Sequence, residues 1–196
     1  MKHIKLFESW AEGETLQYSP TSDIQTISPE EAKALIVKGI TNEAEGVGMT
    51  KPIMLVGAPG SGKTQVIAAA ADEAGVEPIM LDLSTMDLAD FVGAPSLSTK
   101  EIPNVQPGEP GVMSGTMESE IPSWFPVEGP GVLVLDGLNR AESPVMNAAL
   151  SLAYSGRLQG AELPKGFLVI ATADGYESEE VLTKVIADRF KIYQLA

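Results

Sequence analysis

The feature that most constrains this chain is a glycine-rich segment, Gly57-Ala58-Pro59-Gly60-Ser61-Gly62-Lys63-Thr64, which matches the pattern G-x-x-x-x-G-K-[ST]. Glycines let the backbone curl until successive N–H groups converge on a phosphate. In this pattern Lys63 reaches the β- and γ-phosphate oxygens, and Thr64 supplies a hydroxyl ligand to Mg²⁺. The segment therefore predicts a phosphate-binding loop, and we expect the next residue, Gln65, to contact the same ligand.

The segments on either side of this loop predict a strand before it and a helix after it. Residues 51–56 form a short apolar run that is typical of a strand buried on both faces. Residues 62–74 are rich in alanine, carry Val66 and Ile67 on one apolar face and end at Gly75. A strand, a glycine loop and a helix in this order direct the N-terminus of the helix at an anion.

A second apolar run, residues 131–136, ends in Asp136. In proteins with this kind of loop, an acidic residue at the end of such a strand lies beside the Mg²⁺. Asp136 and Thr64 are therefore the predicted metal ligands. Many ATPases of this class have a glutamate at the next position, where it polarises the attacking water, but this chain has Gly137. A glycine cannot act as a base.

Composition limits the classes of function that remain. The 196 residues are enough for one α/β core and short for two domains. The formal net charge of −14, from 13 basic and 27 acidic residues, disfavours direct binding of nucleic acid. There is no cysteine, and His3 is the single histidine. Since no signal-like or bilayer-length apolar run is present, we expect no membrane contact and a cytoplasmic location.

The order of predicted elements indicates an α/β, three-layer α-β-α fold with a mainly parallel five-stranded sheet. Residues 1–27 are expected to be an N-terminal arm, which docks on the core or on a neighbouring subunit, and residues 28–196 the core. Strands are predicted at 51–56, 77–83, 131–136, 167–172 and 191–195, and helices at 28–38, 62–74, 86–91, 143–154 and 178–188.

Residues 96–130 are predicted to be an irregular insertion, because prolines and glycines recur throughout the segment. A small hairpin is expected within residues 112–120, and a hairpin turn later, at 157–163. Long excursions from a compact domain are often functional, so the insertion is a candidate contact surface. For Trp124 and Phe125 the alternative, packing against the core, is equally open.

From about residue 50 onward the chain resembles the core of an AAA+ ATPase, most of all the MoxR and dynein-related branch. The resemblance is carried by the loop 57–64, by Val132-Leu-Val-Leu-Asp-Gly-Leu-Asn-Arg-Ala141 and by Ala187-Asp-Arg-Phe190. Shorter matches are Ile121-Pro-Ser-Trp-Phe-Pro126, Gly156-Arg-Leu158 and Leu163-Pro164. The opening, residues 2–8, resembles the starts of some bacteriophage proteins, which with the short length suggests a phage origin and so the host cytoplasm.

The resemblance implies ATP and Mg²⁺ as ligands and a homo-oligomeric ring, with a hexamer as the expected size. It implies that Arg189 reaches the ATP of the adjacent subunit, and we expect Arg140 to face a neighbour's nucleotide as well. Asp174 stands where the polar sensor residue of the family is usually asparagine. Such proteins remodel protein partners, often together with a partner that bears a von Willebrand factor A domain.

Three departures from the family pattern bear on activity. Gly137 replaces the catalytic glutamate, and Glu142 lies several residues further along the chain. An anionic Asp174 would repel a γ-phosphate unless it carried a proton or turned to Mg²⁺. The chain ends directly after the last predicted core strand, so no C-terminal helical lid is expected.

Two functions follow as hypotheses. The first is an ATP-binding, oligomeric AAA+-like protein with slow ATP hydrolysis, in which Asp136, Asp174, Arg189 and Arg140 are the candidate catalytic residues. The second is a non-hydrolysing interaction module that ATP stiffens. A small-molecule kinase is disfavoured, since the chain offers no basic lid that could close over an acceptor.

Overall fold

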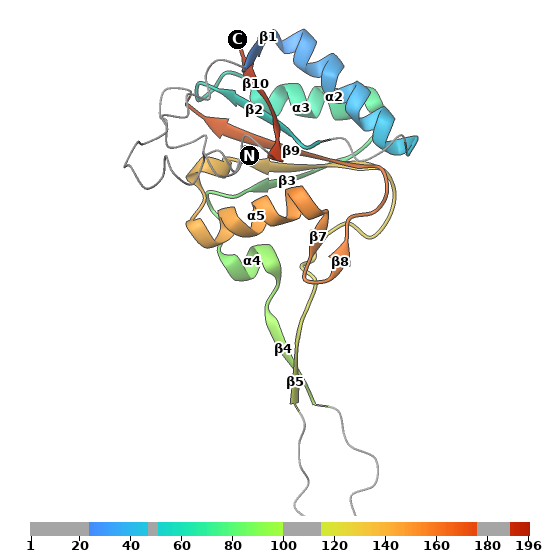
Figure 1. Ribbon diagram of the computed structural model, residues 1–196. Helices are drawn as coiled ribbons and strands as arrows, with labels where there is room; N and C mark the ends of the chain where they lie inside the picture. The colour runs from blue at the N-terminus through green and yellow to red at the C-terminus, as the bar shows by residue number, and fades with distance from the viewer. Residues whose placement is uncertain (1–23, 47–50, 100–114, 176–188) are drawn as a thin grey trace, which may run out of the picture.

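The computed structural model describes residues 24–46, 51–99, 115–175 and 189–196. Its centre is a six-stranded sheet in which all neighbouring strands are parallel (Figure 1). In sheet order the strands are β1 (Gln25–Ile27), β10 (Lys191–Leu195), β2 (Ile53–Gly57), β9 (Phe167–Asp174), β6 (Gly131–Asp136) and β3 (Pro78–Asp82). The predicted α/β fold with a parallel sheet is confirmed, and the sheet has one strand more than the predicted five.

The additional strand, β1, comes from the end of the predicted N-terminal arm. Its residues pair with Tyr193–Leu195 of β10, and the N–H of Ala196 donates a hydrogen bond to the carbonyl of Ile27 (3.0 Å). Three residues are too few to give a readable strand pattern, so the sequence did not predict this element. This end of the arm docks on the chain's own core, and residues 1–23 lie outside the described residues.

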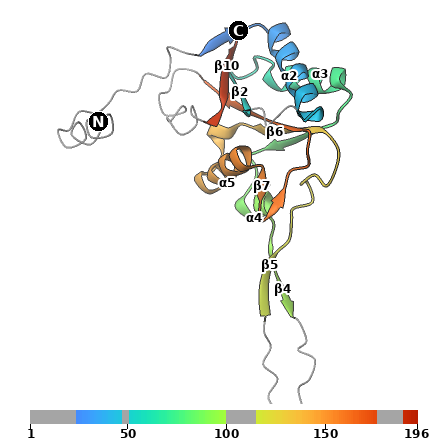
Figure 2. The ribbon, with the colours of Figure 1, turned by 45° about the vertical axis from the view of Figure 1, so that its right-hand side comes forward.

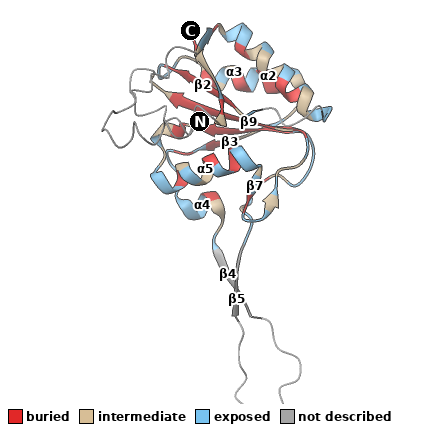
Figure 3. Cartoon of the chain, viewed as in Figure 1, coloured by how far each residue is buried: buried red, intermediate tan, exposed pale blue. Residues whose placement is uncertain are grey.

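Helices cover both faces of the sheet (Figure 2). One face is covered by α2 (Pro29–Ala44) and α3 (Lys63–Ala74), and the other by α4 (Leu88–Val92) and α5 (Ser143–Ser155). Strand side chains alternate between the two faces: Met54 and Val56 join one core cluster, and Ile53 and Leu55 join the other. Strands β2, β6 and β9 are therefore buried along almost their whole length (Figure 3), which explains their continuous apolar sequences.

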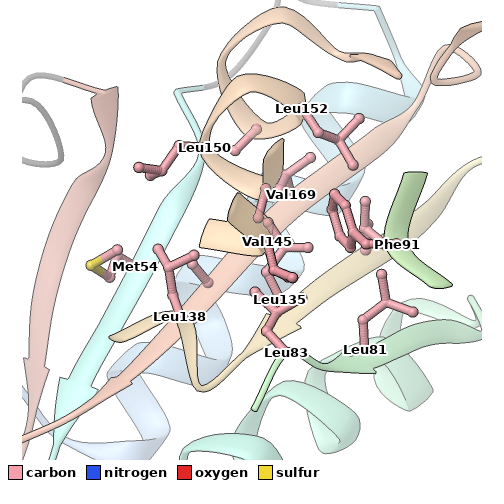
Figure 4. Close-up of a cluster of buried hydrophobic side chains, with 14 of the residues drawn as sticks. Met54, Leu81, Leu83, Phe91, Leu135, Leu138, Val145, Leu150, Leu152 and Val169 are labelled. Carbon is pink, nitrogen blue, oxygen red and sulfur yellow. The ribbon is translucent and has the colours of Figure 1, made fainter. Parts of the chain in front are cut away.

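The cluster beneath α4 and α5 fixes these helices against the sheet (Figure 4). Phe91 of α4 and Val145 and Leu152 of α5 are fully buried against side chains of β6 and β9, including Leu135 and Val169. Fully burying one such side chain stabilises the fold by about 1.5–3 kcal/mol. Because β6 and β9 carry polar residues at their carboxyl ends, this packing also fixes the positions of those residues.

Helix α2 begins where the sequence predicts and continues beyond the predicted end. Ser28 and Glu31 form a capping box, in which each side chain accepts a hydrogen bond from the other residue's N–H. Gly39, the predicted stop, lies buried inside the helix. A Cβ atom there would lie 3.0 Å from Leu168 Cδ2, so this glycine allows α2 to approach β9 closely.

The predicted insertion contains a two-stranded ribbon that projects from the body of the domain (Figures 1 and 2). Strands β4 (Pro95–Thr99) and β5 (Gly115–Ser119) pair in antiparallel register. The prediction of a hairpin within 112–120 was wrong, because β5 pairs with a strand upstream of that segment. Trp124 and Phe125 pack on the core: Trp124 contacts the ring of Phe91 (5.3 Å between centroids) and donates a hydrogen bond to the carbonyl of Asp90 (3.2 Å).

The remaining elements are short. Leu138–Arg140 form a 3-10 turn after β6, and β7 (Arg157–Leu158) pairs with β8 (Ala161–Glu162) as the predicted hairpin turn. The predicted helix at 178–188 lies outside the described residues. Across the described ranges, no helix combines the length and the apolar character needed to cross a membrane.

Candidate functional site

The glycine-rich loop connects the carboxyl end of β2 to the first turn of α3. Gly60 (φ 79°) and Gly62 (φ 86°) have left-handed backbone conformations, which other residues rarely adopt. Gly62 is the N-cap of α3, and no side chain caps this helix end. The unpaired N–H groups and the positive end of the helix dipole are therefore directed at the space in front of the loop, where they favour an anion.

Lys63 is buried beside this loop, with 6% of its surface exposed. Its ammonium group donates hydrogen bonds to the carbonyls of Gly57 (3.0 Å) and Ala58 (2.9 Å) and forms an ion pair with Asp174 Oδ1 (2.8 Å). A lysine ammonium has three N–H donors. In this structure all three donors have a partner.

Asp174 reaches Lys63 because of the strand register. It is the last residue of β9 and lies directly opposite Gly57, the last residue of β2. Its second carboxylate oxygen, Oδ2, lies 3.3 Å from Arg140 Nε. Its backbone is held by the side chain of Asn139, which donates to the Asp174 carbonyl (2.8 Å) and accepts from the Asp174 N–H (3.0 Å).

Asp136 lies at the carboxyl end of the next strand, β6. The hydroxyl of Thr172, from β9, donates a hydrogen bond to Asp136 Oδ1 and accepts one from the N–H of Gly137 (2.9 Å). Thr172 is 1% exposed, so both bonds are shielded from water. They fix the direction in which the Asp136 carboxylate points.

Gly137 has φ 69° and ψ 39°, in the left-handed region. A Cβ atom at this position would lie 2.9 Å from a terminal nitrogen of Arg140. Gly137, at the position where the family resemblance led us to expect a glutamate, thus fits a backbone conformation that disfavours any side chain. Glu142, further along, is exposed and does not line the cavity described next.

A cavity of about 300 Å³ lies where these elements meet. It is lined by loop residues, by the two acids and by one arginine: Pro59, Gly60, Gly62, Lys63, Thr64, Gln65, Asp136, Arg140 and Asp174. The donor set fits a magnesium nucleotide, because backbone N–H groups and an ammonium suit a phosphate, while a hydroxyl and a carboxylate offer oxygen ligands for a hard cation.

The remaining predicted site residues lie behind the cavity or away from it. Gly57 and Ala58 face Lys63 through their carbonyls, and Ser61 Oγ is buried without a hydrogen-bond partner among the described residues. Arg140 does line the cavity; we expected it to face a neighbouring subunit, and it contacts Asp174 of its own chain.

Arg189 does not line the cavity. Its guanidinium carbon lies 5.1 Å from the centre of the Tyr154 ring at the end of α5. It precedes β10, whose first residue pairs with Ile53 at the beginning of β2, whereas the loop follows the end of β2. Arg189 therefore lies near the amino-terminal ends of the strands, whereas the loop of its own chain lies at their carboxyl ends.

Two residues of this site, Asn139 and Thr172, were not among the predicted site residues. Thr172 is a polar residue within an apolar strand sequence, which is a usable signal. Asn139 belongs to the Leu-Asn-Arg-Ala string, but nothing local indicates that its side chain binds the backbone of Asp174.

With this geometry in place, the comparisons with known proteins identify the family. Residues 52–190 match the AAA domain of the dynein-related subfamily. The chain belongs to this AAA family. The match begins just before β2 and ends at Phe190, so it includes every residue of the cavity and leaves out β1, α2 and β10. No curated protein matches the sequence.

Solved structures show the same fold at low sequence identity. A Thermotoga maritima RuvB mutant is 13% identical with a TM-score of 0.53, over 84% of this chain and 44% of that chain. The Thermotoga maritima RuvB Holliday junction branch migration motor is 16% identical with a TM-score of 0.50, over 85% of this chain and 44% of that chain. Hsp104 of S. cerevisiae, in its complex with casein in the extended conformation, is 14% identical with a TM-score of 0.55, over 87% of this chain and 33% of that chain. The AAA chain thus spans less than half the length of each of these proteins.

Proposed function

We propose that this AAA domain binds Mg-ATP in the cavity at the carboxyl ends of β2, β9 and β6. The observation that carries the proposal is the convergence of Lys63, Thr64 and Asp136 on one cavity in front of an uncapped helix N-terminus. The loop N–H groups and Lys63 would hold the phosphates, and Thr64 and Asp136 would hold the metal. Bound Mg²⁺ would neutralise negative charge on the phosphates.

We propose further that ATP hydrolysis is slow. A carboxylate next to Asp136 would orient and polarise the attacking water, and Gly137 leaves that position without one. Loss of such a group reduces catalysis far more than binding, because the phosphate-binding loop does not depend on it. The protein would therefore remain in its ATP-bound state for a long time in each cycle.

The position of Arg189 supports an oligomer. Arg189 lies at the end of the sheet where the strands begin, whereas the loop of its own chain lies at the other end. It could therefore contact only a nucleotide that is bound to another copy of the chain. An arginine that stabilises transition-state charge in this way contributes on the order of a thousandfold or more to turnover. We propose that such an oligomer remodels or assembles protein partners, because the net charge of −14 opposes binding to a phosphate backbone.

The test is the rate of ATP hydrolysis per subunit over a wide range of protein concentrations. We expect the rate to rise with concentration and then level off, and Arg189→Ala to remove that rise without changing nucleotide affinity. Arg157→Ala is the matched control, because Arg157 is an exposed arginine paired with Glu162 in the β7–β8 hairpin. Equal loss in both variants, or a rate per subunit that does not depend on concentration, would contradict the oligomeric mechanism.

The second candidate function, a non-hydrolysing interaction module stiffened by ATP, is favoured by one observation. Gly137 combines a left-handed backbone with an N–H bonded to Thr172, an arrangement built around the absence of a side chain. This candidate predicts nucleotide binding with no turnover above background at any protein concentration. The same concentration series therefore separates the two functions.

A further inference from the structure

The Lys63 ammonium already has an anionic partner in this structure, namely Asp174. Two of its three donors bind the neutral carbonyls of Gly57 and Ala58, and the third binds Asp174 Oδ1 at 2.8 Å. A phosphate oxygen that approaches Lys63 must take one of these donors. Asp174 is the only one of the three partners that is negatively charged, as the incoming phosphate is, so the phosphate competes with Asp174 for Lys63.

The backbone of Asp174 cannot move away to make room. It is fixed by the pairing of β9 with β2 opposite Gly57 and by two hydrogen bonds to the side chain of Asn139. Only the carboxylate can turn, and Arg140 Nε, 3.3 Å from Oδ2, offers it a second cation. The side chain of Arg140 is 51% exposed, so it is free to follow the carboxylate toward solvent. Even a displaced carboxylate thus stays at the rim of the cavity.

We propose that Asp174 acts as an internal competitor for the terminal phosphate, so that this site discriminates against nucleoside triphosphates relative to diphosphates. The inference rests on the proposed nucleotide binding at the same site. The terminal phosphate is the group that the loop lysine contacts beyond the β-phosphate. A triphosphate therefore brings two charged phosphates to Lys63 and so next to Asp174, whereas a diphosphate brings only one. Like charges a few ångströms apart repel strongly where water is partly excluded.

The test compares the affinities of ATP and ADP, each with Mg²⁺, by titration calorimetry on the wild type and on Asp174→Asn. Asparagine keeps the size of the side chain and one acceptor for Lys63 while it removes the charge. We expect ATP affinity to rise by about tenfold or more and ADP affinity to change by less than about threefold. Thermal unfolding of both proteins without nucleotide verifies that the variant is folded, and Asp174→Ser replaces it if it is not.

The matched control is Asp82→Asn. Asp82 ends β3 opposite Asp136, at the same sheet edge, and its exposed carboxylate accepts hydrogen bonds from Ser84. The hydroxyl of Ser84 holds the pKa of Asp82 below its ordinary value, so the control removes a full negative charge near the site. We expect it to leave the ratio of ATP to ADP affinity unchanged, because Asp82 does not contact Lys63.

The outcomes separate this inference from the function on which it rests. An ATP-to-ADP ratio that rises in Asp174→Asn and not in Asp82→Asn supports internal competition. Binding of both nucleotides with an unchanged ratio in Asp174→Asn, or with the same change in Asp82→Asn, overturns the inference and leaves the proposed function standing. Failure of every protein to bind either nucleotide overturns the proposed function and the inference together.

Discussion

Replacing Gly137 with alanine should destabilise the empty protein by about 1–2 kcal/mol. The backbone at this position has φ 69° and ψ 39°, and a left-handed conformation costs a non-glycine residue about 1–2 kcal/mol. The new Cβ would also lie 2.9 Å from a terminal nitrogen of Arg140. Moving this half-exposed side chain weakens its ion pair with Asp174, which contributes about 0–1 kcal/mol. Alanine also lowers the conformational entropy of the unfolded chain, which offsets about 0.4–1 kcal/mol of this destabilisation.

Thermal unfolding measures this effect. For a domain of this size, 1 kcal/mol corresponds to about 2–4 °C in Tm, so we expect Gly137→Ala to lower Tm by about 2–8 °C. Gly137→Asn should lower it less, because asparagine adopts the left-handed conformation more readily. Gly75→Ala is the matched control for the backbone cost alone. Gly75 has a similar left-handed conformation (φ 70°, ψ 28°), but a Cβ there meets no described atom within 4 Å. An unchanged Tm for Gly137→Ala, or equal losses for alanine and asparagine, would refute the conformational argument.

Three further predictions concern the site. Gly137→Glu should raise the ATP turnover of the folded fraction, because general-base assistance contributes about a hundredfold to ten-thousandfold; a folded variant that binds ATP without faster turnover would favour the non-hydrolysing module. Asp136→Ala should weaken ATP binding strongly when magnesium is present and only slightly when it is absent. Equal ATP affinities of the wild type with and without magnesium would contradict the role assigned to Asp136. Tyr154→Leu removes the ring beside Arg189 and should lower Tm while keeping concentration-dependent turnover; loss of turnover as large as in Arg189→Ala would mean that Arg189 acts structurally.

Local patterns in the sequence were enough to predict that the glycine-rich loop lies between a strand and a helix, and that Asp136 lies at the end of a buried strand. A buried parallel strand is a continuous apolar run, and a loop that binds phosphate needs glycines and a lysine at fixed spacing. Each of these signals lies within a few residues along the chain. The three-layer fold followed from their alternation, and the sheet confirms it.

The contacts within the site could not be predicted in the same way. The ion pair between Lys63 and Asp174 depends on the register that places Asp174 opposite Gly57, and the bond from Thr172 to Asp136 depends on the pairing of β9 with β6. Register is set by the packing of whole strands between two helical layers, which no short window of sequence contains.

The errors at element boundaries have a similar cause. Gly39 has the appearance of a helix end, but tertiary packing uses it for close approach to Leu168. The hairpin expected at residues 112–120 was wrong because the partner of β5 lies upstream, in β4. In both cases a distant segment decided the outcome, and local preference alone was too weak to indicate it.

The central claim is that Lys63 and its loop bind a nucleotide, and calorimetric titration of the wild type and Lys63→Ala with Mg-ATP tests it most directly. We expect the wild type to bind and the variant to lose binding, since the phosphate charge then has no buried cation as its partner. Lys63→Met is the matched control, because it keeps most of the buried side-chain volume and removes the charge alone. Binding that is absent in the wild type, or equally tight in a folded Lys63→Ala protein, would contradict the account.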